Sequence, residues 1–489
     1  MALLLGMDLP TVLVFLIVFC IAYYVISKPK NLPPGPPVIP FLGSLDFLMK
    51  GNRMEQFARY HKQYGKVFRM YVGGYLVVVL SGFDVVRDAF VTQADCFSHR
   101  PNFMWWVSQI KAGIFMSSGQ AWKDLRRFSL QTMRDFGMGK SSVEDKVKDE
   151  VNAILTILSE SDGKRFHFHD FMDVATGNII CSLIFGERYD YHDEKFHELM
   201  RLLNDVVKSP GSLNPYYAIP LLRMLPSTQQ KARVSLGHMK RLCEFVKGVV
   251  QEHEQSYDPN NIRDFVDLYI QMRDGEGQTN KAYSLENFLR LIVDLFLAGT
   301  ETSSTSVNWA LLYMMKYPDI QKKCQEEIDN NIGRGRMITF SDRANLAYVE
   351  ATINEVLRLS PVVPFFIPHS TNADTTLAGY NIPNETIVLV NVLSVHKDPK
   401  YWDDVDEFKP ERFLDEKGKL KKIDAFIPFS IGPRVCAGET LARMEVLMYF
   451  ANMLQNFTFR KPDGDTLNFK GFIGATYFPL PYELIAEKR

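Results

Sequence analysis

The sequence lacks features by which several large classes of protein are identified. Its 56 basic and 57 acidic side chains give a formal net charge of -1, and this balance gives no sign of nucleic-acid binding. Its six cysteines form neither CxxC pairs nor a disulfide framework, which favours a reducing compartment. No G-x-G-x-x-G follows a predicted strand, so electrons for any redox reaction must come from another protein.

Beyond residue 45 the chain also lacks linkers, internal repeats and low-complexity tracts, so residues 46–489 are predicted to form one large domain. Hydrophobic residues make up 46% of the chain and charged residues 23%, which excludes a disordered protein. Helical periodicity dominates, and strand-like runs occur at Lys66–Gly82, with Gly73-Gly74 as a turn, and between Thr375 and Val392. The predicted fold class is mainly α with small β-sheets.

One predicted helix is much longer than the others. Ser284 has the side chain of an N-cap, and Tyr317-Pro318 ends the helical pattern after Lys316. The helix would hold about 33 residues and measure roughly 50 Å, which is enough to cross the whole domain.

The amino terminus could be a cleaved signal peptide or a membrane span. It lacks the positive leading region and the small-x-small cleavage site of a signal peptide. Asp8 is the only charge from Ala2 to Ile26, and the apolar run is long enough to cross a hydrocarbon core of about 30 Å. Because positive charges follow this run, residues 1–27 are predicted to be a single membrane span with the remainder in the cytosol. The proline-rich residues 28–45 predict a stiff hinge, or else a flexible tether.

One cysteine stands in an unusual setting, the segment FSIGPRVCAG from Phe429 to Gly438. Gly432 and Gly438 bracket Cys436, and glycine lets a backbone approach a flat ligand closely. The helical pattern that follows places the sulfur at a helix N-terminus, which favours a thiolate, and Arg434 suits a carboxylate of the ligand. Such a thiolate can bind heme iron. The alternatives are a catalytic nucleophile, although no histidine stands in the preceding thirty residues, and an inert buried thiol.

The spacing F-x-x-G-x-R-x-C-x-G resembles the heme-binding signature of the cytochrome P-450 superfamily, in which the matching cysteine is the axial iron ligand. Further segments resemble that family in its own order along the chain. They are W-x-x-x-R at Trp122 and Arg126, A-G-x-E-T-S at residues 298–303, E-x-x-R at Glu355 and Arg358, and P-E-R-F at Arg412. The resemblance covers the chain after residue 30 and is nearest to the animal microsomal members. It implies the family's fold, with heme between the long central helix and the cysteine segment, and one transmembrane helix before it.

The middle of the long helix carries the predicted oxygen chemistry. Gly299 weakens the helix, and the Thr302 hydroxyl can bond back to the Ala298 carbonyl. We expect a local opening that holds O2 and water, with Glu301 and Thr302 as catalytic acid and hydroxyl relay. A solvated polar patch is the alternative.

The resemblance also implies a set of residues that bind heme b, the iron protoporphyrin IX. Cys436 would bind the metal, and the remaining members would hold the propionates. They are Arg100, Trp122, Arg126, His369 and Arg434. For His369, a satisfied loop histidine is an equally good interpretation, and Arg100 is similarly open.

The implied partners are a membrane, NADPH-cytochrome reductase as the source of electrons, and cytochrome b5 as a further candidate. An acidic partner would be steered to a basic face. The candidate residues for this face, which could instead be ordinary solvated charges, are Lys123, Arg127, Arg134, Lys140 and Arg443.

The predicted function is an NADPH- and O2-dependent monooxygenase of the endoplasmic reticulum membrane, acting on a small lipophilic xenobiotic, fatty acid or steroid. One alternative is a heme-thiolate enzyme that rearranges peroxides without a reductase, whose members commonly lack the acid-alcohol pair. Another is a membrane-bound heme sensor without turnover. The resemblance places an apolar pocket wall at Trp105, Trp106, Ile114, Phe115, Phe296, Val363, Phe365 and Ile473.

Overall fold

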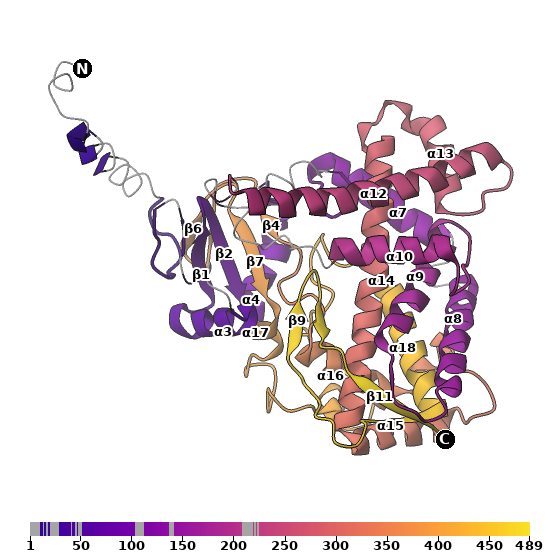
Figure 1. Ribbon diagram of the computed structural model, residues 1–489. Helices are drawn as coiled ribbons and strands as arrows, with labels where there is room; N and C mark the ends of the chain where they lie inside the picture. Colours follow the sequence, from indigo (N-terminus) through magenta and orange to yellow (C-terminus); the bar gives the residue numbers. More distant parts are fainter. Residues whose placement is uncertain are drawn as a thin grey trace.

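The computed structural model describes residues 10–12, 14–15, 18–19, 29–40, 42–44, 46, 51–102, 112–135, 141–207, 219, 222 and 224–489. The chain forms a large helical body with a small sheet packed at one side of it (Figure 1). The predicted class, mainly α with small β-sheets, is therefore confirmed.

The long helix α14 runs from Leu285 to Lys316 and passes through the helical body (Figure 1). Ser284 caps it by accepting a hydrogen bond from the Asn287 N–H, and Pro318 follows its end, as the sequence predicts. The helix continues unbroken through Gly299. A Cβ there would lie 2.3 Å from Cδ1 of Ile180 on α9 (His169–Ile184), so Gly299 allows the two helices to pack closely.

Among the described residues, eight further helices share one hydrophobic core with α14 and α9. They are α7 (Gly119–Asp135), α8 (Ser141–Glu160), α10 (Glu194–Val207), α12 (Pro226–Ser256), α13 (Phe265–Asp274), α15 (Pro318–Asn331), α16 (Ala347–Leu359) and α18 (Glu439–Asn456). Four others belong to two separate clusters of buried residues, which they share with strands of the sheet. They are α3 (Arg53–Tyr64), α4 (Phe83–Arg87), α5 (Ala94–Phe97) and α17 (Val392–His396). Single turns of 3-10 or π-helix lie at Asp88–Thr92, Glu276–Thr279, Lys281–Tyr283, Phe340–Asn345 and Pro410–Phe413.

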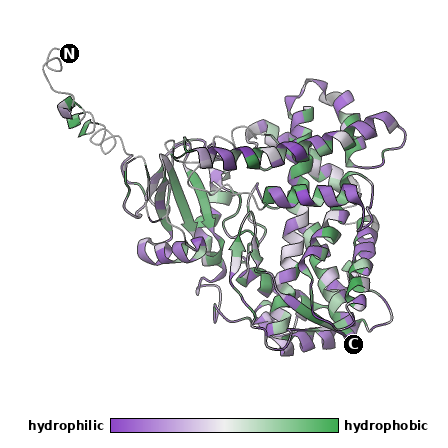
Figure 2. Cartoon of the chain, in the orientation of Figure 1, coloured by the Kyte–Doolittle hydropathy of each residue, from purple (hydrophilic) through white to green (hydrophobic). Residues whose placement is uncertain are grey.

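The largest sheet has four strands in the order β1 (Val67–Val72), β2 (Tyr75–Ser81), β7 (Ile387–Asn391) and β4 (His369–Ser370). The first two form the predicted hairpin, with Val72 opposite Tyr75 across the Gly73-Gly74 turn. Strand β7 pairs with β2 in parallel, which joins two segments more than 300 residues apart. Its residues are all buried, and Figure 2 shows apolar residues concentrated in this sheet.

The described residues also form three smaller sheets. The first contains β3 (Phe166–His167), β11 (Glu483–Lys488) and β8 (Phe457–Arg460). The others are the pairs β9 (Gly471–Ile473) with β10 (Tyr477–Pro479) and β5 (Thr375–Leu377) with β6 (Tyr380–Ile382). The predicted strand region between Thr375 and Val392 is therefore confirmed as β5, β6 and β7.

The segment before the sheet is bonded to it along its described part. The Arg69 N–H of β1 donates to the Pro34 carbonyl at 2.8 Å, and Gly43 forms a bridge with Val72. At Gly35 a Cβ would come within 1.9 Å of the Arg69 carbonyl oxygen. This part of the proline-rich segment therefore packs against the folded body, contrary to the flexible-tether alternative.

The predicted membrane span at residues 1–27 lies mostly outside the described residues. Those that are described there, between Pro10 and Phe19, are helical. Among all described residues, no helix combines the length and apolar character that a membrane crossing requires.

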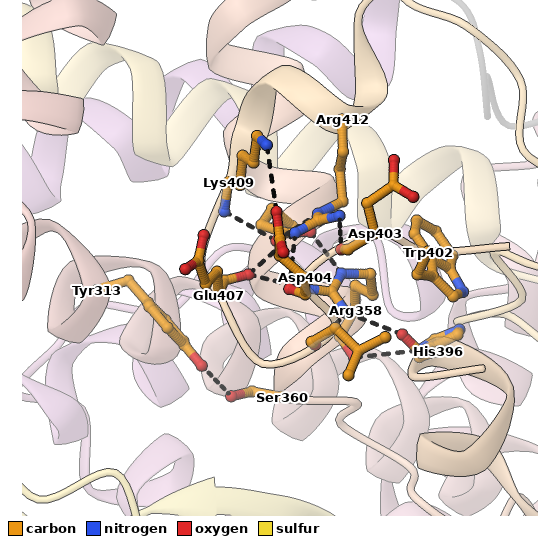
Figure 3. A network of polar contacts seen from close by, with 12 residues as sticks. Tyr313, Arg358, Ser360, His396, Trp402, Asp403, Asp404, Glu407, Lys409 and Arg412 are labelled. Carbon is orange, nitrogen blue, oxygen red and sulfur yellow. Dashed lines mark hydrogen bonds and ion pairs between the residues drawn. The ribbon is translucent and has the colours of Figure 1, made fainter. Parts of the chain in front are cut away.

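The predicted fold residues Glu355, Arg358 and Arg412 form one buried network. Figure 3 shows Arg358 and Arg412 within it. Both carboxylate oxygens of Glu355 accept hydrogen bonds from Arg358, at 2.6 and 2.8 Å, and one also accepts from Arg412 Nε at 2.9 Å. Arg358 donates further to the carbonyls of His396, Val405 and Glu407. The network therefore ties α16 to the irregular segment that precedes the cysteine.

Candidate active site

A cavity of about 990 Å³ lies between α14 and the segment that carries Cys436. Its wall includes the middle of α14, the loop 362–369, the residues 428–438 around the cysteine, and the segment 471–476, together with residues of several other elements. The volume is at the upper end of the range for small-molecule sites. Cys436, Glu301 and Thr302 all line this one cavity.

The loop around Cys436 is closed by a hydrogen bond from its backbone N–H to the Phe429 carbonyl at 2.9 Å. Helix α18 begins at Glu439, so the sulfur stands just before a helix N-terminus, as predicted. The sequence analysis explained Gly432 by the close approach of a flat ligand, but the structure gives another reason. Its φ is 79°, and a Cβ there would lie 2.0 Å from the Phe90 carbonyl oxygen, so Gly432 makes room for protein backbone.

The charge state of Cys436 results from opposing influences. Burial raises the pKa of the thiol above its ordinary value, whereas the Gly438 N–H, Arg126 and Arg443 act to lower it. Arg434, which the sequence analysis assigned to a carboxylate of the ligand, donates to the carbonyls of Ser98, Ile114 and Ser117. A bound metal ion would shift the balance, because a coordinating thiol is deprotonated.

Three arginines gather on the wall near the cysteine. Arg100, Arg126 and Arg434 donate hydrogen bonds to backbone carbonyls, and none of the three forms an ion pair with a carboxylate within the described residues. Burial, followed by repulsion among the three, lowers the pKa of Arg100 to about 9 and that of Arg434 to about 8. Trp122 packs beneath them, with the Arg434 guanidinium 3.8 Å from the centre of its ring.

These residues fit a heme group. Two buried cations, Arg100 and Arg434, and the half-buried Arg126 have no carboxylate partner among the described residues. They provide a strong site for anions, and heme carries two propionates. Cys436 is exposed to the same cavity and supplies a sulfur ligand for iron. The sequence-predicted residues Arg100, Trp122, Arg126, Arg434 and Cys436 are thus brought together although they come from distant parts of the chain.

His369 lines the same cavity but is held in strand β4. Its ring stacks on Phe90 with centroids 4.0 Å apart, and its Nδ1 lies 2.7 Å from the Phe97 carbonyl oxygen. Burial and the neighbouring Arg100 lower the pKa of His369 well below its ordinary value, so the ring is neutral and Nδ1 donates to Phe97. It is therefore a satisfied histidine and also part of the cavity wall.

On α14, the Thr302 hydroxyl donates to the Ala298 carbonyl at 2.6 Å, as predicted. Glu301 is buried and accepts a hydrogen bond from the Thr476 hydroxyl at 3.0 Å. The alternative of a solvated polar patch is therefore wrong for Glu301. No pattern in the sequence indicated Thr476, because it reaches α14 from the turn before β10.

Two further charged residues of the wall were missed by sequence reasoning. Glu445 of α18 is buried, accepts a hydrogen bond from the Ser303 hydroxyl, and has its pKa raised to about 8 by burial. Arg290 of α14 is also buried. Glu445 and Arg290 each stand among apolar residues of a predicted helix, and this was the sequence signal that could have indicated them.

The predicted aromatic and aliphatic wall is correct in part. Ile114, Phe115, Val363, Phe365 and Ile473 line the cavity. The prediction for Phe296 was wrong, because its ring packs against Phe185 with centroids 5.2 Å apart. Trp105 and Trp106 lie outside the described residues.

The predicted basic face is centred on α7. Lys123, Arg127 and Arg134 are exposed there, and within the described residues no carboxylate pairs with them. Arg443 differs, because it pairs with Glu439 at 2.9 Å and covers the Phe429 ring at 4.8 Å. Lys140 lies outside the described residues.

Comparison with known proteins gives one family and several similar proteins. The family model described as Cytochrome P450 matches residues 33–485. Cytochrome P450 2J2 of Homo sapiens is 38% identical over 472 residues, covering 94% of this chain and 92% of that protein. Cytochrome P450 2J1 of Oryctolagus cuniculus is 38% identical over 498 residues, covering 99% and 97%. Cytochrome P450 2U1 of Mus musculus is 38% identical over 485 residues, covering 94% and 91%.

Proposed function

Since the chain belongs to the cytochrome P450 family, whose members are heme-thiolate monooxygenases, we propose that it is membrane-anchored and inserts one oxygen atom from O2 into a small lipophilic substrate. Family membership implies a heme cofactor and electrons from NADPH through a partner reductase. The observation that carries the proposal is the cavity itself: Cys436 lines it from one element and the Glu301-Thr302 pair from another.

The cofactor would be held by residues of known geometry. Cys436 would bind the iron, and Arg100, Arg126 and Arg434 would bind the propionates, with Trp122 supporting two of the guanidiniums. His369 completes the set as a neutral group whose Nε2 is free of the Phe97 bond. Heme, when bound, supplies the iron at which O2 is reduced.

Thr302 and Glu301 would bind water and transfer protons. The Thr302 proton is directed at the Ala298 carbonyl, so its oxygen offers lone pairs to a hydrogen-bond donor in the cavity. Glu301 is held by Thr476 and provides an acid near that hydroxyl. This pair supports a monooxygenase over a peroxide-rearranging enzyme or a sensor without turnover.

The membrane anchor and the partners belong to the same proposal. Residues 1–27 would form a single span in the endoplasmic reticulum membrane, residues 28–45 the hinge, and residues 46–489 a catalytic domain in the cytosol. Val14, Phe15, Val18 and Phe19 are more than half exposed, which suits contact with lipid. NADPH-cytochrome reductase and cytochrome b5 would dock at the α7 side, where Lys123, Arg127 and Arg134 are exposed.

The first test is spectroscopic and enzymatic. Reduced protein with carbon monoxide should give the thiolate-type heme spectrum, and Cys436→Ser should abolish it. Product should form from a lipophilic substrate when NADPH and reductase are present. Turnover with added peroxide alone, and none with NADPH and reductase, would favour the peroxide-rearranging alternative.

Thr302→Ala tests the relay separately from heme binding. The variant should keep the thiolate spectrum, because Thr302 donates only to the Ala298 carbonyl. It should form less product and release more hydrogen peroxide for each NADPH consumed. If the ratio of product to NADPH matched that of the unaltered protein, Thr302 would have no part in proton delivery.

A further inference from the structure

Thr476 lies in the turn between β9 and β10 and reaches the middle of α14. It is 4% exposed, and it lines the same cavity as Glu301 and Thr302. Its hydroxyl donates to Oε1 of Glu301 at 3.0 Å. A hydrogen bond to a carboxylate is stronger than one between neutral groups, and burial of both partners strengthens it further. Thr476 is therefore a candidate for the group that fixes the direction of the Glu301 side chain.

Hydrogen bonds hold the backbone on both sides of the Thr476 side chain. The Gly474 N–H donates to the Thr476 carbonyl at 2.8 Å and closes the turn. The Tyr477 N–H donates to the Val362 carbonyl at 2.7 Å, which joins the turn to another part of the cavity wall. Because the neighbouring peptide groups are held in this way, the Thr476 hydroxyl is presented from a fixed position.

Strand β10 is also joined to the helix that carries Glu301. The indole N–H of Trp309 on α14 donates to the Tyr477 carbonyl at 2.9 Å. The rings of Trp309 and Tyr477 stack with their centroids 5.2 Å apart, and both side chains are buried. The donor of the hydrogen bond to Glu301 and the helix of its acceptor are therefore held together by further contacts.

The Thr476 hydroxyl takes no part in those further contacts. They are made by backbone groups and by the indole of Trp309, so they would remain if the hydroxyl were removed. A hydroxyl has a single proton to donate, and that of Thr476 is donated to Glu301. The hydroxyl therefore acts on the Glu301 side chain, whereas the backbone around it shapes the turn.

We propose that Thr476 is a positioning residue, whose hydroxyl holds the Glu301 carboxyl group in the orientation that serves proton transfer with Thr302. The inference rests on the proposed function for the reaction that uses these protons. A glutamate side chain has several rotatable bonds and samples many directions when nothing holds it. Fixing an acid in advance of the reaction lowers the cost of reaching the reactive geometry.

A thermodynamic cycle on the full chain with heme bound tests the hydrogen bond itself. Thr476→Val keeps the size of the side chain and removes the hydroxyl, and Glu301→Ala removes the acceptor. In urea unfolding, Thr476→Val should lower the folding equilibrium constant roughly tenfold to a hundredfold, as for a hydrogen bond to a charged group, and much less when Glu301→Ala is present. Equal effects in the two backgrounds would overturn the proposal.

Turnover with NADPH, reductase and a lipophilic substrate tests the role in the reaction. Thr476→Val should keep the thiolate-type spectrum with carbon monoxide. Its ratio of product to NADPH should fall roughly tenfold, which is part of the hundredfold that a misplacement of about 1 Å can cost, and it should release more hydrogen peroxide. Thr476→Ser keeps the hydroxyl and should restore most of the ratio. An unchanged ratio in Thr476→Val, or no recovery in Thr476→Ser, would overturn the proposal.

Thr176→Val is the matched control. Thr176 of α9 is buried, and its hydroxyl donates to the Thr300 carbonyl of α14 at 2.9 Å, one residue before Glu301. This variant loses a hydroxyl against the same stretch of helix but no hydrogen bond to a carboxyl group. Its ratio of product to NADPH should match that of the unaltered protein, and a fall as large as in Thr476→Val would overturn the proposal.

The outcomes separate this inference from the proposed function. If the unaltered protein forms no product with NADPH and reductase, the proposed function is refuted, whatever the thermodynamic cycle gives. If product forms and Thr476→Val leaves its ratio to NADPH unchanged, only the role of Thr476 is refuted. If Thr476→Val does not fold, Thr476→Ala takes its place in both tests.

Discussion

Two clusters of arginine side chains differ in what balances their charge. In the network of Figure 3, Arg358 and Arg412 share the carboxylate of Glu355 and donate their remaining hydrogen bonds to carbonyls. On the cavity wall, Arg100, Arg126 and Arg434 have carbonyls as partners and no carboxylate among the described residues. The first cluster is complete without a ligand, whereas the second needs an anion. Unbalanced charge therefore distinguishes a ligand site from a structural brace.

The largest expected effect comes from removing the balancing charge of the first cluster. Glu355→Ala would leave two buried guanidiniums without a carboxylate, and the free energy of unfolding should fall by about 3–5 kcal/mol. Urea denaturation followed by circular dichroism measures this. Glu350→Ala on the same helix is the control, since its partner Arg343 is 42% exposed and water can solvate it. Similar losses in both variants would mean that burial of the pair does not matter.

Arg126→Gln should affect heme binding far more than folding. The protein would lose one of three like charges and one bond to the Val435 carbonyl. Heme affinity should drop roughly tenfold to a hundredfold, since a hydrogen bond to a charged group contributes about 1.5–3 kcal/mol. Transfer of heme to an excess of apomyoglobin measures the effect. An unchanged transfer rate would contradict the assignment of this cluster to the propionates.

Glu445 is a buried carboxyl group without a cationic partner, whereas the cavity-wall arginines are cations without a carboxylate partner. Burial raises its pKa to about 8, so the folded protein holds a proton there that the unfolded chain releases near its ordinary pKa. The stabilisation is complete below the unfolded pKa, declines as the pH rises, and is lost above about 8. Glu445→Gln should remove this decline, by about 1 kcal/mol or more between pH 6 and pH 8.

Urea titrations of both proteins at several pH values provide the measurement. The unaltered protein should become less stable from pH 6 to pH 8, and Glu445→Gln should show a flatter profile. Parallel profiles would mean that Glu445 is ionised throughout this range in the folded protein.

The smallest effect is expected for exposed cations. Lys123→Gln and Arg127→Gln should leave the free energy of unfolding within about 0.5 kcal/mol of its original value, because water already solvates these side chains. Association with the reductase should slow at low ionic strength and recover at high ionic strength. Stopped-flow reduction of the heme at two salt concentrations checks this, and a salt-independent rate would exclude electrostatic steering by this face.

Local signals in the sequence predicted much of the fold. Ser284 and Pro318 set the ends of α14, Gly73-Gly74 set the hairpin, and the helical pattern after Gly438 set the start of α18. Each signal acts within a few residues, through a cap, a turn or a missing N–H group. The motif residues for heme could likewise be selected from spacing and resemblance.

Other features could not be predicted in this way. Phe296 was expected to face the cavity but packs on Phe185, because its side of α14 is covered by a neighbouring element. The partners of Arg434 are carbonyls as many as 336 residues away in the chain. The burial of Glu445 and Arg290 depends on the elements that pack against their helices, so it was known only from the structure.

The sequence by itself determined the helical class, the long central helix, the hairpin and the cysteine segment, since short-range hydrogen bonds and backbone restrictions produce them. Only the tertiary structure decided that Gly432 makes room for Phe90 and that Thr476 holds Glu301. Burial and the availability of acceptors depend on which distant segments pack together, and these two quantities decide whether a charge supports the fold or binds a ligand.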